Sequence, residues 1–263
     1  MISDRVKRVE MFGVPMASMT LRSAAEMLAE ISRDKNTQVV IPCNVEHVVL
    51  MNSNEEFLKA YKRADWIFPD GMPLVWFSRL IGRRLPERVT GADLLPEICR
   101  IAEKKGLRIF LLGGTSDVTP LAKKKLLELF PKLQIAGIAT PWINLEERGD
   151  HDDNIVDIIN ATNPDIIFVG FGAPKQEIWT DRNRHRLKTG VVCMVGGTFD
   201  FLARKTIRAP RWMQEAGLEW FWRLFHEPKR LWKRYLIGSF IFLRLVWKEW
   251  RIQRRKRINS FFE

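Results

Sequence analysis

The sequence predicts an α/β fold, in which helices cover both faces of a mostly parallel sheet and a helical appendage follows at the C-terminal end. Three observations support this prediction. Short β-branched runs alternate with helical patterns, most of these runs end at Pro or Gly, and the positive charge is concentrated in the last 60 residues. The alternation is typical of Rossmann-like sheets. With 263 residues, 46% of them hydrophobic, the chain has enough apolar material for such a core.

Six apolar runs fit buried strands, and five amphipathic segments fit the helices between them. The predicted strands are residues 38–42, 66–68, 108–112, 134–138, 165–169 and 191–195. The predicted helices are residues 21–31, 45–64, 93–105, 120–130 and 154–161, with Asn44 as a helix cap. Ligands of such sheets bind beyond the carboxyl ends of the strands. We therefore expect the site in the loops that start at Pro42, Pro69, Gly113, Gly170 and Gly196.

The positive charge divides the chain into two parts. The chain carries 43 Lys and Arg against 31 Asp and Glu, a net charge of +12. Residues 204–263 hold 16 of those basic residues, 5 of the acidic ones and six of the ten tryptophans. We therefore predict a core at residues 1–203 and a basic, Trp-rich helical appendage at residues 204–263 that meets phosphates or an anionic membrane surface.

The appendage predicts one helix near residues 211–226 and a second that begins at Pro228, because the residue before a proline avoids the α region. One side of the second helix is basic: Arg230, Arg234, Arg244, Lys248, Arg251 and Arg255. The opposite side is apolar: Trp232, Leu236, Phe240, Leu243, Trp247 and Trp250. This pattern is typical of a helix in a membrane interface. Packing on the body or on another subunit, as in a homo-oligomer, is the alternative.

Several function classes find little support. Three cysteines without a CxxC argue against a disulfide scaffold and a zinc ribbon, and the four histidines lack ligand spacing. No GxSxG occurs that would favour a covalent hydrolase. A nicotinamide-dependent oxidoreductase lacks its GxGxxG, and a nucleic-acid-binding protein would rest on the basic tail alone. No run approaches about eighteen uncharged apolar residues, so we expect no membrane-spanning helix.

Asp70 is the first candidate catalytic residue. It follows a buried-looking strand in the sequence Pro69-Asp70-Gly71. Pro69 fixes one dihedral angle and Gly71 permits a sharp turn, so the carboxylate projects into the ligand crevice, where a general base belongs. The alternative is that Asp70 caps the next helix.

Glycine turns follow three further strands. They hold Gly113 and Gly114, Gly170 and Gly172, and Gly196 and Gly197. Their main-chain N–H groups are suited to cradle a diphosphate or to approach a nucleotide base closely, although they match neither GxGxxG nor a P-loop. The alternative for each is a plain tight turn.

Two charged motifs complete the candidates. Arg88 precedes a helix that Thr90 or Asp93 can cap, and its guanidinium suits an anionic group; the alternative is a surface arginine. The literal Asp-x-Asp at residues 150–152 suits Mg²⁺ or Mn²⁺ with a nucleotide sugar, whereas the favoured interpretation is an acidic helix N-terminus. We therefore expect no cofactor and a metal-independent reaction, with Mg²⁺ or Mn²⁺ left open.

Eight short blocks occur in order between about residues 41 and 234. They are Pro42-Cys43-Asn44, Pro69-Asp70-Gly71, Arg88-Val89-Thr90-Gly91-Ala92-Asp93, Leu112-Gly113-Gly114, Gly172-Ala173-Pro174-Lys175-Gln176-Glu177, Val195-Gly196-Gly197-Thr198-Phe199-Asp200, Arg208-Ala209-Pro210, and Gly217-Leu218-Glu219-Trp220 with Arg223 and Pro228. Together they resemble the blocks of the WecG/TagA/CpsF glycosyltransferases (glycosyltransferase family 26), bacterial enzymes that extend undecaprenyl-diphosphate-linked sugars.

This resemblance implies an inverting transfer from a UDP-sugar to a lipid-diphosphate-linked sugar. N-acetylmannosaminyl transfer to GlcNAc-diphosphoundecaprenol is the default, and UDP-glucose-dependent β-glucosyl transfer in exopolysaccharide assembly is the alternative. The resemblance implies Asp70 as general base, with Asn44, Arg88 and Gln176 lining the same pocket. Many members have Thr-Pro-Asn where this chain has Pro42-Cys43-Asn44 after Ile41, so the threonine hydroxyl is missing.

The implied reaction needs positive charge to stabilise the departing diphosphate, and without a metal motif arginines must supply it. The candidates are Arg88, Arg208, Arg211, Arg223 and Arg230. The other predicted substrate-binding residues are Asn44, Asp93, Gly113, Gly114, Gly172, Lys175, Glu177, Gly196 and Gly197. We expect a peripheral enzyme on the cytoplasmic face of the bacterial plasma membrane, with the tail folding over the pocket where the lipid acceptor resides.

Overall fold

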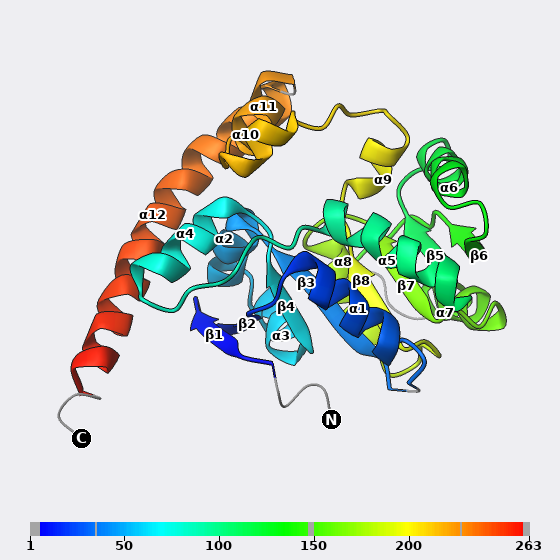
Figure 1. The fold of residues 1–263 in the computed structure, drawn as a ribbon, viewed down its shortest axis with the longest axis horizontal. Coiled ribbons are helices and arrows are strands. Elements are labelled where there is room, and N and C mark those ends of the chain that lie inside the picture. The colour runs from blue at the N-terminus through cyan, green and yellow to red at the C-terminus, as the bar shows by residue number, and fades with distance from the viewer. Residues whose placement is uncertain (1–5, 35, 147–149, 227, 260–263) are drawn as a thin grey trace.

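The computed structural model describes residues 6–34, 36–146, 150–226 and 228–259. Within these ranges, the side chains of residues 150–151, 229–231, 233–237 and 256–259 lie outside the description. Figure 1 shows a sheet between layers of helices, with a long C-terminal helix along one end of the molecule. The predicted α/β class is confirmed.

The sheet has eight strands in the order β1-β2-β4-β3-β8-β7-β5-β6. Their bounds are β1 Arg8–Met11, β2 Val14–Ala17, β3 Gln38–Cys43, β4 Trp66–Pro69, β5 Arg108–Gly113, β6 Gln134–Ala139, β7 Ile166–Gly170 and β8 Val191–Met194. Only the β1–β2 pair is antiparallel. The carboxyl ends of the seven parallel strands therefore lie at one edge of the sheet.

Nine helices precede the tail, and three form it, in the part of the chain that the structure describes. The first nine are α1 Leu21–Ile31, α2 Val45–Ser53, α3 Glu55–Arg63, α4 Met72–Leu80, α5 Gly91–Lys105, α6 Val118–Leu129, α7 Asp150–Ala161, α8 Lys175–Asn183 and α9 Thr198–Leu202. The tail holds α10 Arg211–Glu215, α11 Glu219–His226 and α12 Pro228–Asn259.

Alternate residues of each strand face opposite layers, as the period of a strand requires. Val40 and Phe68 pack with α1, α5 and α6 on one face. Val39, Ile41 and Ile67 pack with α2, α3 and α4 on the other face, where α7 and α8 cover the β5–β7–β8 half. The three cysteines, Cys43, Cys99 and Cys193, are buried and free.

Several elements differ from the prediction. The helices α4, α8 and α9 have no counterpart among the predicted helices. The β1–β2 hairpin was not foreseen, because each strand is only four residues long and its turn is Phe12-Gly13, both with positive φ (55° and 77°). The single helix predicted over residues 45–64 is two helices, because Asn54 ends α2 and its side chain accepts the Phe57 N–H that begins α3. The helix predicted near residues 211–226 is broken at Gly217, which has φ +70°.

The last helix has one face on the body and one face exposed. α12 lies along α2 and α11 and runs down one end of the molecule (Figure 1). Phe242 is buried beside the core of α2–α4, and Leu245, Val246 and Trp250 pack against the same core. Exposed apolar side chains lie on another side: Trp232, Phe240, Leu243 and Trp247.

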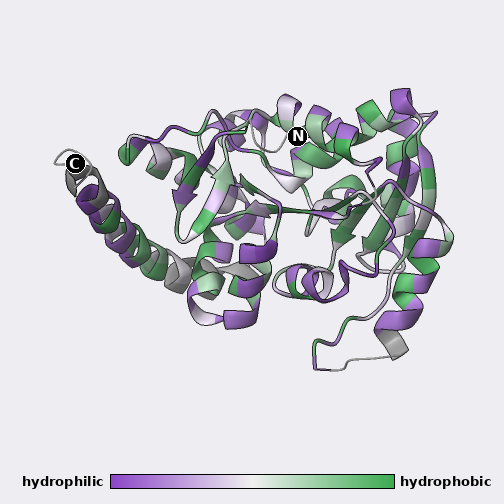
Figure 2. Cartoon of the chain, turned by 90° about the horizontal axis from the view of Figure 1, so that it is seen from below, coloured by the Kyte–Doolittle hydropathy of each residue, from purple (hydrophilic) through white to green (hydrophobic). Residues whose placement is uncertain are grey.

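Packing on the body was one of the two alternatives to a membrane-bound helix, and α12 does pack on the body. Hydrophilic and hydrophobic residues alternate along it in Figure 2, which reflects its separate docked, apolar and basic faces. Among the described residues, Arg244, Lys248, Arg251 and Arg255 are exposed on the basic face, whereas the side chains of Arg230, Arg234 and Leu236 lie outside the description. No helix in the described ranges is both long enough and apolar enough to cross a membrane.

Candidate functional site

The predicted loops meet at the carboxyl edge of the sheet, because β4, β3, β8 and β7 are neighbours. The Asp70 N–H donates to the Cys43 carbonyl over 2.6 Å, so the ends of β4 and β3 are joined. The Gly196 N–H donates to Gln176 Oε1 over 3.2 Å and joins the loops after β8 and β7. The side chains of Asn44, Asp70 and Gln176 thus belong to adjacent loops on one edge.

Asp70 is placed by the turn that follows β4. Gly71 has φ +141°, a conformation that favours glycine, and it is the N-cap of α4 without any side-chain cap hydrogen bond. The alternative that Asp70 caps this helix is therefore wrong. Burial raises the pKa of the Asp70 carboxyl to about 7, with the charge of Glu219 adding to the rise and that of Arg88 opposing it. A carboxyl that titrates near neutral pH is suited to accept and release a proton.

Arg88 lies beside Asp70 rather than on the surface. The main chain holds its loop in place, since the Val89 N–H donates to the Pro69 carbonyl over 2.8 Å. Its Nη1 donates to Glu219 Oε2 over 2.9 Å and its Nη2 to Gln214 Oε1 over 2.8 Å. Both partners belong to the tail, so the appendage reaches the centre of the predicted site.

Arg208 and Asp93 form the second ion pair of this cluster. Arg208 Nη1 lies 2.6 Å from Asp93 Oδ1, and its Nε lies 3.6 Å from Glu219 Oε1. Burial is the largest single influence on Asp93 and works against its ionisation. The hydrogen bonds from Arg208 and Thr90 and the charges of Arg208 and Arg88 together outweigh it, so the pKa of Asp93 lies below its usual value. Thr90, the N-cap of α5, donates its hydroxyl to Asp93 Oδ2 over 2.8 Å. Arg208 Nε and Nη2 are buried without a hydrogen-bond partner among the described residues.

Gln176 and Glu177 are buried at the start of α8. Gln176 Nε2 donates to Glu177 Oε1 over 2.8 Å, while the other oxygen of that carboxyl, Oε2, is buried without a partner in the described structure. Burial raises the pKa of Glu177 to about 7. Gln176 therefore links the buried carboxyl of Glu177 to the Gly196 loop.

The glycines divide into two groups. A Cβ on Gly113 would lie 2.7 Å from the main-chain carbon of Gly170, and one on Gly114 would collide with Thr119. Gly113 therefore permits β5 and β7 to approach closely, and Gly114 leaves room for Thr119 and Phe199. Gly172 and Gly196 have positive φ and nothing within 4 Å of an added Cβ, whereas a Cβ on Gly197 would lie 3.6 Å from Asp200. Open space therefore lies beside Gly172 and Gly196.

Two predicted binding residues have structural partners. Asn44 caps α2, since its Oδ1 accepts the His47 N–H over 3.0 Å. Lys175 Nζ donates to the Ile143 carbonyl over 2.8 Å and lies 4.5 Å from the centre of the Trp142 ring. Lys175 thus holds the loop after β6.

The structure does not bring all of the predicted arginines to Asp70. Arg211 is exposed and lies 3.5 Å from Glu215. The Nε of Arg223 is buried without a partner among the described residues, and the side chain of Arg230 lies outside the description. Sequence reasoning missed Gln214 and placed no role on Glu219, although Glu219 lies in one of the eight blocks.

The Asp-x-Asp segment is engaged in protein contacts where it is described. Asp152 accepts a hydrogen bond from Trp179 Nε1 over 2.8 Å, and Asp153 pairs with Arg186 at 2.7 Å. The side chains of Asp150 and His151 lie outside the description. Among the described residues, no group of three or more His, Cys, Asp or Glu is arranged to hold a metal ion.

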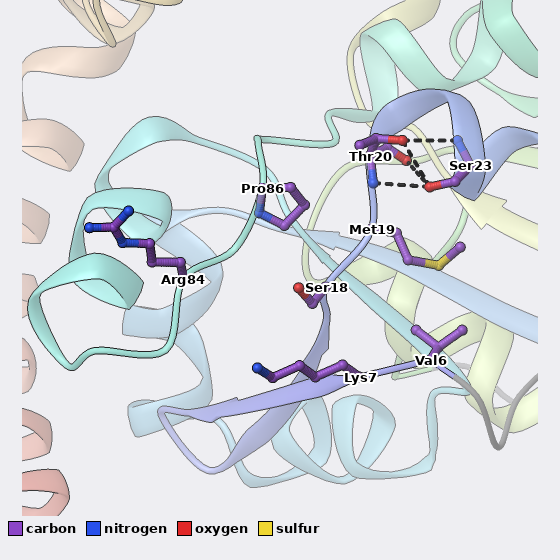
Figure 3. Close-up of a pocket in the computed structure, with 8 residues that line it drawn as sticks. All are labelled: Val6, Lys7, Ser18, Met19, Thr20, Ser23, Arg84 and Pro86. Atoms are coloured by element: carbon purple, nitrogen blue, oxygen red, sulfur yellow. Dashed lines mark hydrogen bonds between the residues drawn. The ribbon is translucent and has the colours of Figure 1, made fainter.

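A pocket of about 560 Å³ lies elsewhere, between the N-terminal strands and the segment before α5 (Figure 3). Its lining consists of Val6, Lys7, Ser18, Met19, Thr20, Ser23, Arg84 and Pro86. In the close-up, Thr20 and Ser23 bond to each other in the capping box of α1. None of the predicted site residues lines this pocket.

Comparisons with known proteins show the family to which the chain belongs. The family model described as "Glycosyl transferase WecG/TagA/CpsF family" matches residues 9–257. The chain belongs to the WecG/TagA/CpsF family of glycosyl transferases. It is therefore an enzyme of the glycosyltransferase class, as the blocks of the sequence predict.

Similar proteins within this WecG/TagA/CpsF family share one name, N-acetylglucosaminyldiphosphoundecaprenol N-acetyl-beta-D-mannosaminyltransferase. The protein of Bacillus subtilis (strain 168) is 33% identical over 224 residues, which cover 85% of each chain. That of Bacillus spizizenii is 31% identical over 197 residues, 75% of this chain and 74% of the relative. That of Staphylococcus aureus (strain MW2) is 28% identical over 237 residues, 89% of this chain and 91% of the relative.

Proposed function

We propose that this protein transfers N-acetylmannosamine from a UDP-sugar to the N-acetylglucosamine of GlcNAc-diphosphoundecaprenol, with inversion at the anomeric carbon, in cell-surface polysaccharide biosynthesis. The names of its relatives support this donor and acceptor and do not favour glucosyl transfer. The observation that carries the proposal is the carboxyl of Asp70, with a pKa of about 7, beside Arg88 at the carboxyl edge of the sheet.

Asp70 acts as the general base in this proposal. Its ionised carboxylate accepts the proton of the acceptor hydroxyl while that oxygen forms a bond to the anomeric carbon of the donor. The bond from the anomeric carbon to the diphosphate oxygen breaks, and its electron pair leaves with UDP. Attack opposite to the leaving group inverts the configuration, and Asp70 then returns its proton to solvent.

The diphosphate is held by arginines. Arg88 and Arg208 are fixed in the same cluster, and Arg208 has two buried N–H donors without partners among the described residues. Guanidinium groups bind phosphate oxygens through two parallel hydrogen bonds and stabilise charge that develops on the leaving group. Open space beside Gly172 and Gly196 leaves room for the donor to approach the main chain there.

The tail places the reaction at a membrane in this proposal. The apolar face of α12 holds Trp232, Phe240, Leu243 and Trp247, all exposed, beside its basic face. A helix with these two faces lies in the interface of an anionic membrane with its tryptophans inserted. The lipid acceptor resides in that membrane, so we place the enzyme peripherally on the cytoplasmic face of the bacterial plasma membrane.

The test is a transfer assay with the full chain, a short-chain lipid-diphosphate-GlcNAc acceptor and a panel of UDP-sugars, with and without EDTA. We expect product from UDP-N-acetylmannosamine that persists in EDTA and is lost in Asp70→Asn. Asp157→Asn, which changes an exposed carboxylate of α7, is the matched control. Product from UDP-glucose alone would establish the glucosyl reaction instead, and product that survives in Asp70→Asn would remove Asp70 from its role.

A further inference from the structure

The carboxylate of Glu219 bridges two arginines that come from separate segments. Its Oε2 accepts from Arg88 Nη1 over 2.9 Å, and its Oε1 lies 3.6 Å from Arg208 Nε. Arg88 precedes α5, whereas Arg208 lies between α9 and α10. Two acidic oxygens placed on two guanidinium groups reproduce the contacts that a phosphate group makes with paired arginines.

The charges of this cluster cancel one another. Arg88 and Arg208 carry two positive charges, and Asp93 and Glu219 supply two carboxylates at ion-pair distance. Asp70 adds a third carboxyl beside them. A diphosphate would therefore enter a site with no net positive charge, and its own negative charge would face the carboxylates at close range. Binding is favourable only if one carboxylate withdraws.

Glu219 is better placed to withdraw than Asp93. Asp93 lies in the first turn of α5, and two hydrogen bonds join it to Thr90. Its side-chain carboxylate accepts from the Thr90 hydroxyl, and its main-chain N–H donates to the oxygen of that hydroxyl. Glu219 is the first residue of α11, an eight-residue helix in which every residue is at least partly exposed. Few packing contacts oppose a small displacement of such a helix.

We propose that Glu219 occupies the place of the donor diphosphate in the ligand-free protein and must leave Arg88 and Arg208 before the donor binds. This inference rests on the proposed function, because it takes the ligand to be a nucleoside diphosphate. When Glu219 leaves, Arg88 Nη1 becomes available, and the two unpartnered donors of Arg208, Nε and Nη2, lie in the same cluster. The Glu219 carboxylate thus competes with the donor diphosphate for the same two arginines, and this competition lowers the affinity for the donor.

The test is calorimetric titration of UDP into the full-length wild type, Glu219→Gln and Glu97→Gln. Glutamine keeps the size of Glu219 and removes its charge. Glu97 lies on α5 and pairs with Arg100, outside the cluster, so its variant changes the net charge of the chain by the same amount. We expect UDP to bind Glu219→Gln about tenfold more tightly than the wild type, and Glu97→Gln to match the wild type. The difference should shrink as KCl is raised.

Unchanged or weaker binding of UDP to Glu219→Gln would overturn the inference, because Glu219 would then be a bystander or a positioning residue for the arginines. Glu219→Asp gives a second measurement if the first variant folds poorly. Its shorter side chain keeps the charge but does not reach both arginines in the present geometry, so we also expect tighter binding. Unfolding of both variants would make Glu219 a structural clamp and would equally overturn the inference.

The two proposals fail in different ways. A folded wild type that transfers the sugar while Glu219→Gln binds UDP no better would refute only the role of Glu219. A folded wild type that transfers no UDP-sugar, with no UDP binding in either protein, would refute the proposed function and the inference together.

Discussion

The Nε2 amide of Gln253 donates a hydrogen bond to the main-chain oxygen of Glu10 over 3.1 Å, and so joins the last helix of the chain to its first strand. The rings of Phe12 and Phe242 lie 5.8 Å apart in the same region. α12 is therefore part of the folded core along one face, while Phe240, Leu243 and Trp247 are exposed on another.

These two faces of α12 should respond differently to truncation. Phe242→Ala removes a buried ring and should lower the free energy of unfolding by about 3 kcal/mol, as Phe→Ala does in cores. Trp247→Ala, on the exposed face, should change stability by less than about 0.5 kcal/mol and weaken co-sedimentation with anionic vesicles about tenfold. Urea unfolding and vesicle sedimentation of both variants provide the measurements. Equal loss of vesicle binding in the two would contradict the assignment of faces.

The transfer rate should depend on pH through Asp70. The base must be ionised, and burial together with the charge of Glu219 raises its pKa to about 7. We therefore expect kcat/KM to rise with pH and to level off above about 7. In Glu219→Gln the acidic limb should move to lower pH, because the charge that opposes ionisation of Asp70 is gone. An acidic limb near pH 4 in the wild type would argue against Asp70 as the base.

Asp70→Asn should lower the transfer rate strongly and raise the stability of the folded protein. A general base contributes about 10²- to 10⁴-fold to the rate, so we expect a loss of that size. The unfolded protein ionises Asp70 near pH 3.8 and the folded protein near 7, so Asp70 lowers stability progressively as the pH rises between these values. Melting temperatures of the variant and the wild type should therefore coincide near pH 4 and diverge in favour of the variant at pH 8. A variant less stable at pH 8 would show that Asp70 is structural.

Arg88→Lys should be a severe substitution although it keeps the charge. Arg88 uses two different nitrogens to reach Glu219 and Gln214, and a lysine has only one. We expect the transfer rate to fall about tenfold or more, with KM for the donor raised. Arg100→Lys, in an i,i+3 pair on α5, serves as the control and should leave the kinetics unchanged. Similar kinetics for Arg88→Lys and the wild type would show that charge alone suffices at this position.

The two groups of glycines predict different costs for alanine. Gly113→Ala and Gly172→Ala both place a side chain at positive φ, but only the first also forces a Cβ to within 2.7 Å of the Gly170 main chain. We expect Gly113→Ala to lower the free energy of unfolding by at least about 2 kcal/mol, and Gly172→Ala to cost about 1 kcal/mol. Denaturant unfolding measures both. The reverse order would show that the close approach of β5 and β7 relaxes easily.

Most of the sheet could be predicted because most of its parallel strands are apolar runs that end near a turn residue. Residues 38–42 and 191–195 are apolar runs that end near a turn residue, and both are strands with nearly those bounds. The β1–β2 hairpin has no such run, since Val9 and Met11 are separated by Glu10 and the turn begins at Phe12. A pattern of four residues is too short to indicate a strand by itself.

The candidate site could be predicted only along the sheet edge. Asp70, Arg88 and Gln176 follow strands or precede helices, so topology alone places them together. Gln214 and Glu219 reach the same cluster from the tail, more than 120 residues after Arg88 in the sequence, and pattern reasoning has no means of placing such contacts. The net positive charge of the tail is also a poor guide to its role in the site, because one of the tail residues that enter the site is the acidic Glu219.

The burial of all three cysteines has a practical consequence. Desolvation raises the pKa of Cys43 to about 12, and burial raises those of Cys99 and Cys193 further above the usual range. A thiol is alkylated as its thiolate, so the native chain should be almost inert to maleimides at neutral pH. A cysteine introduced at the exposed position of Phe225, in α11, would then be a single labelling site. A fluorophore attached there would follow the motion of that helix in real time, without removal of any native cysteine.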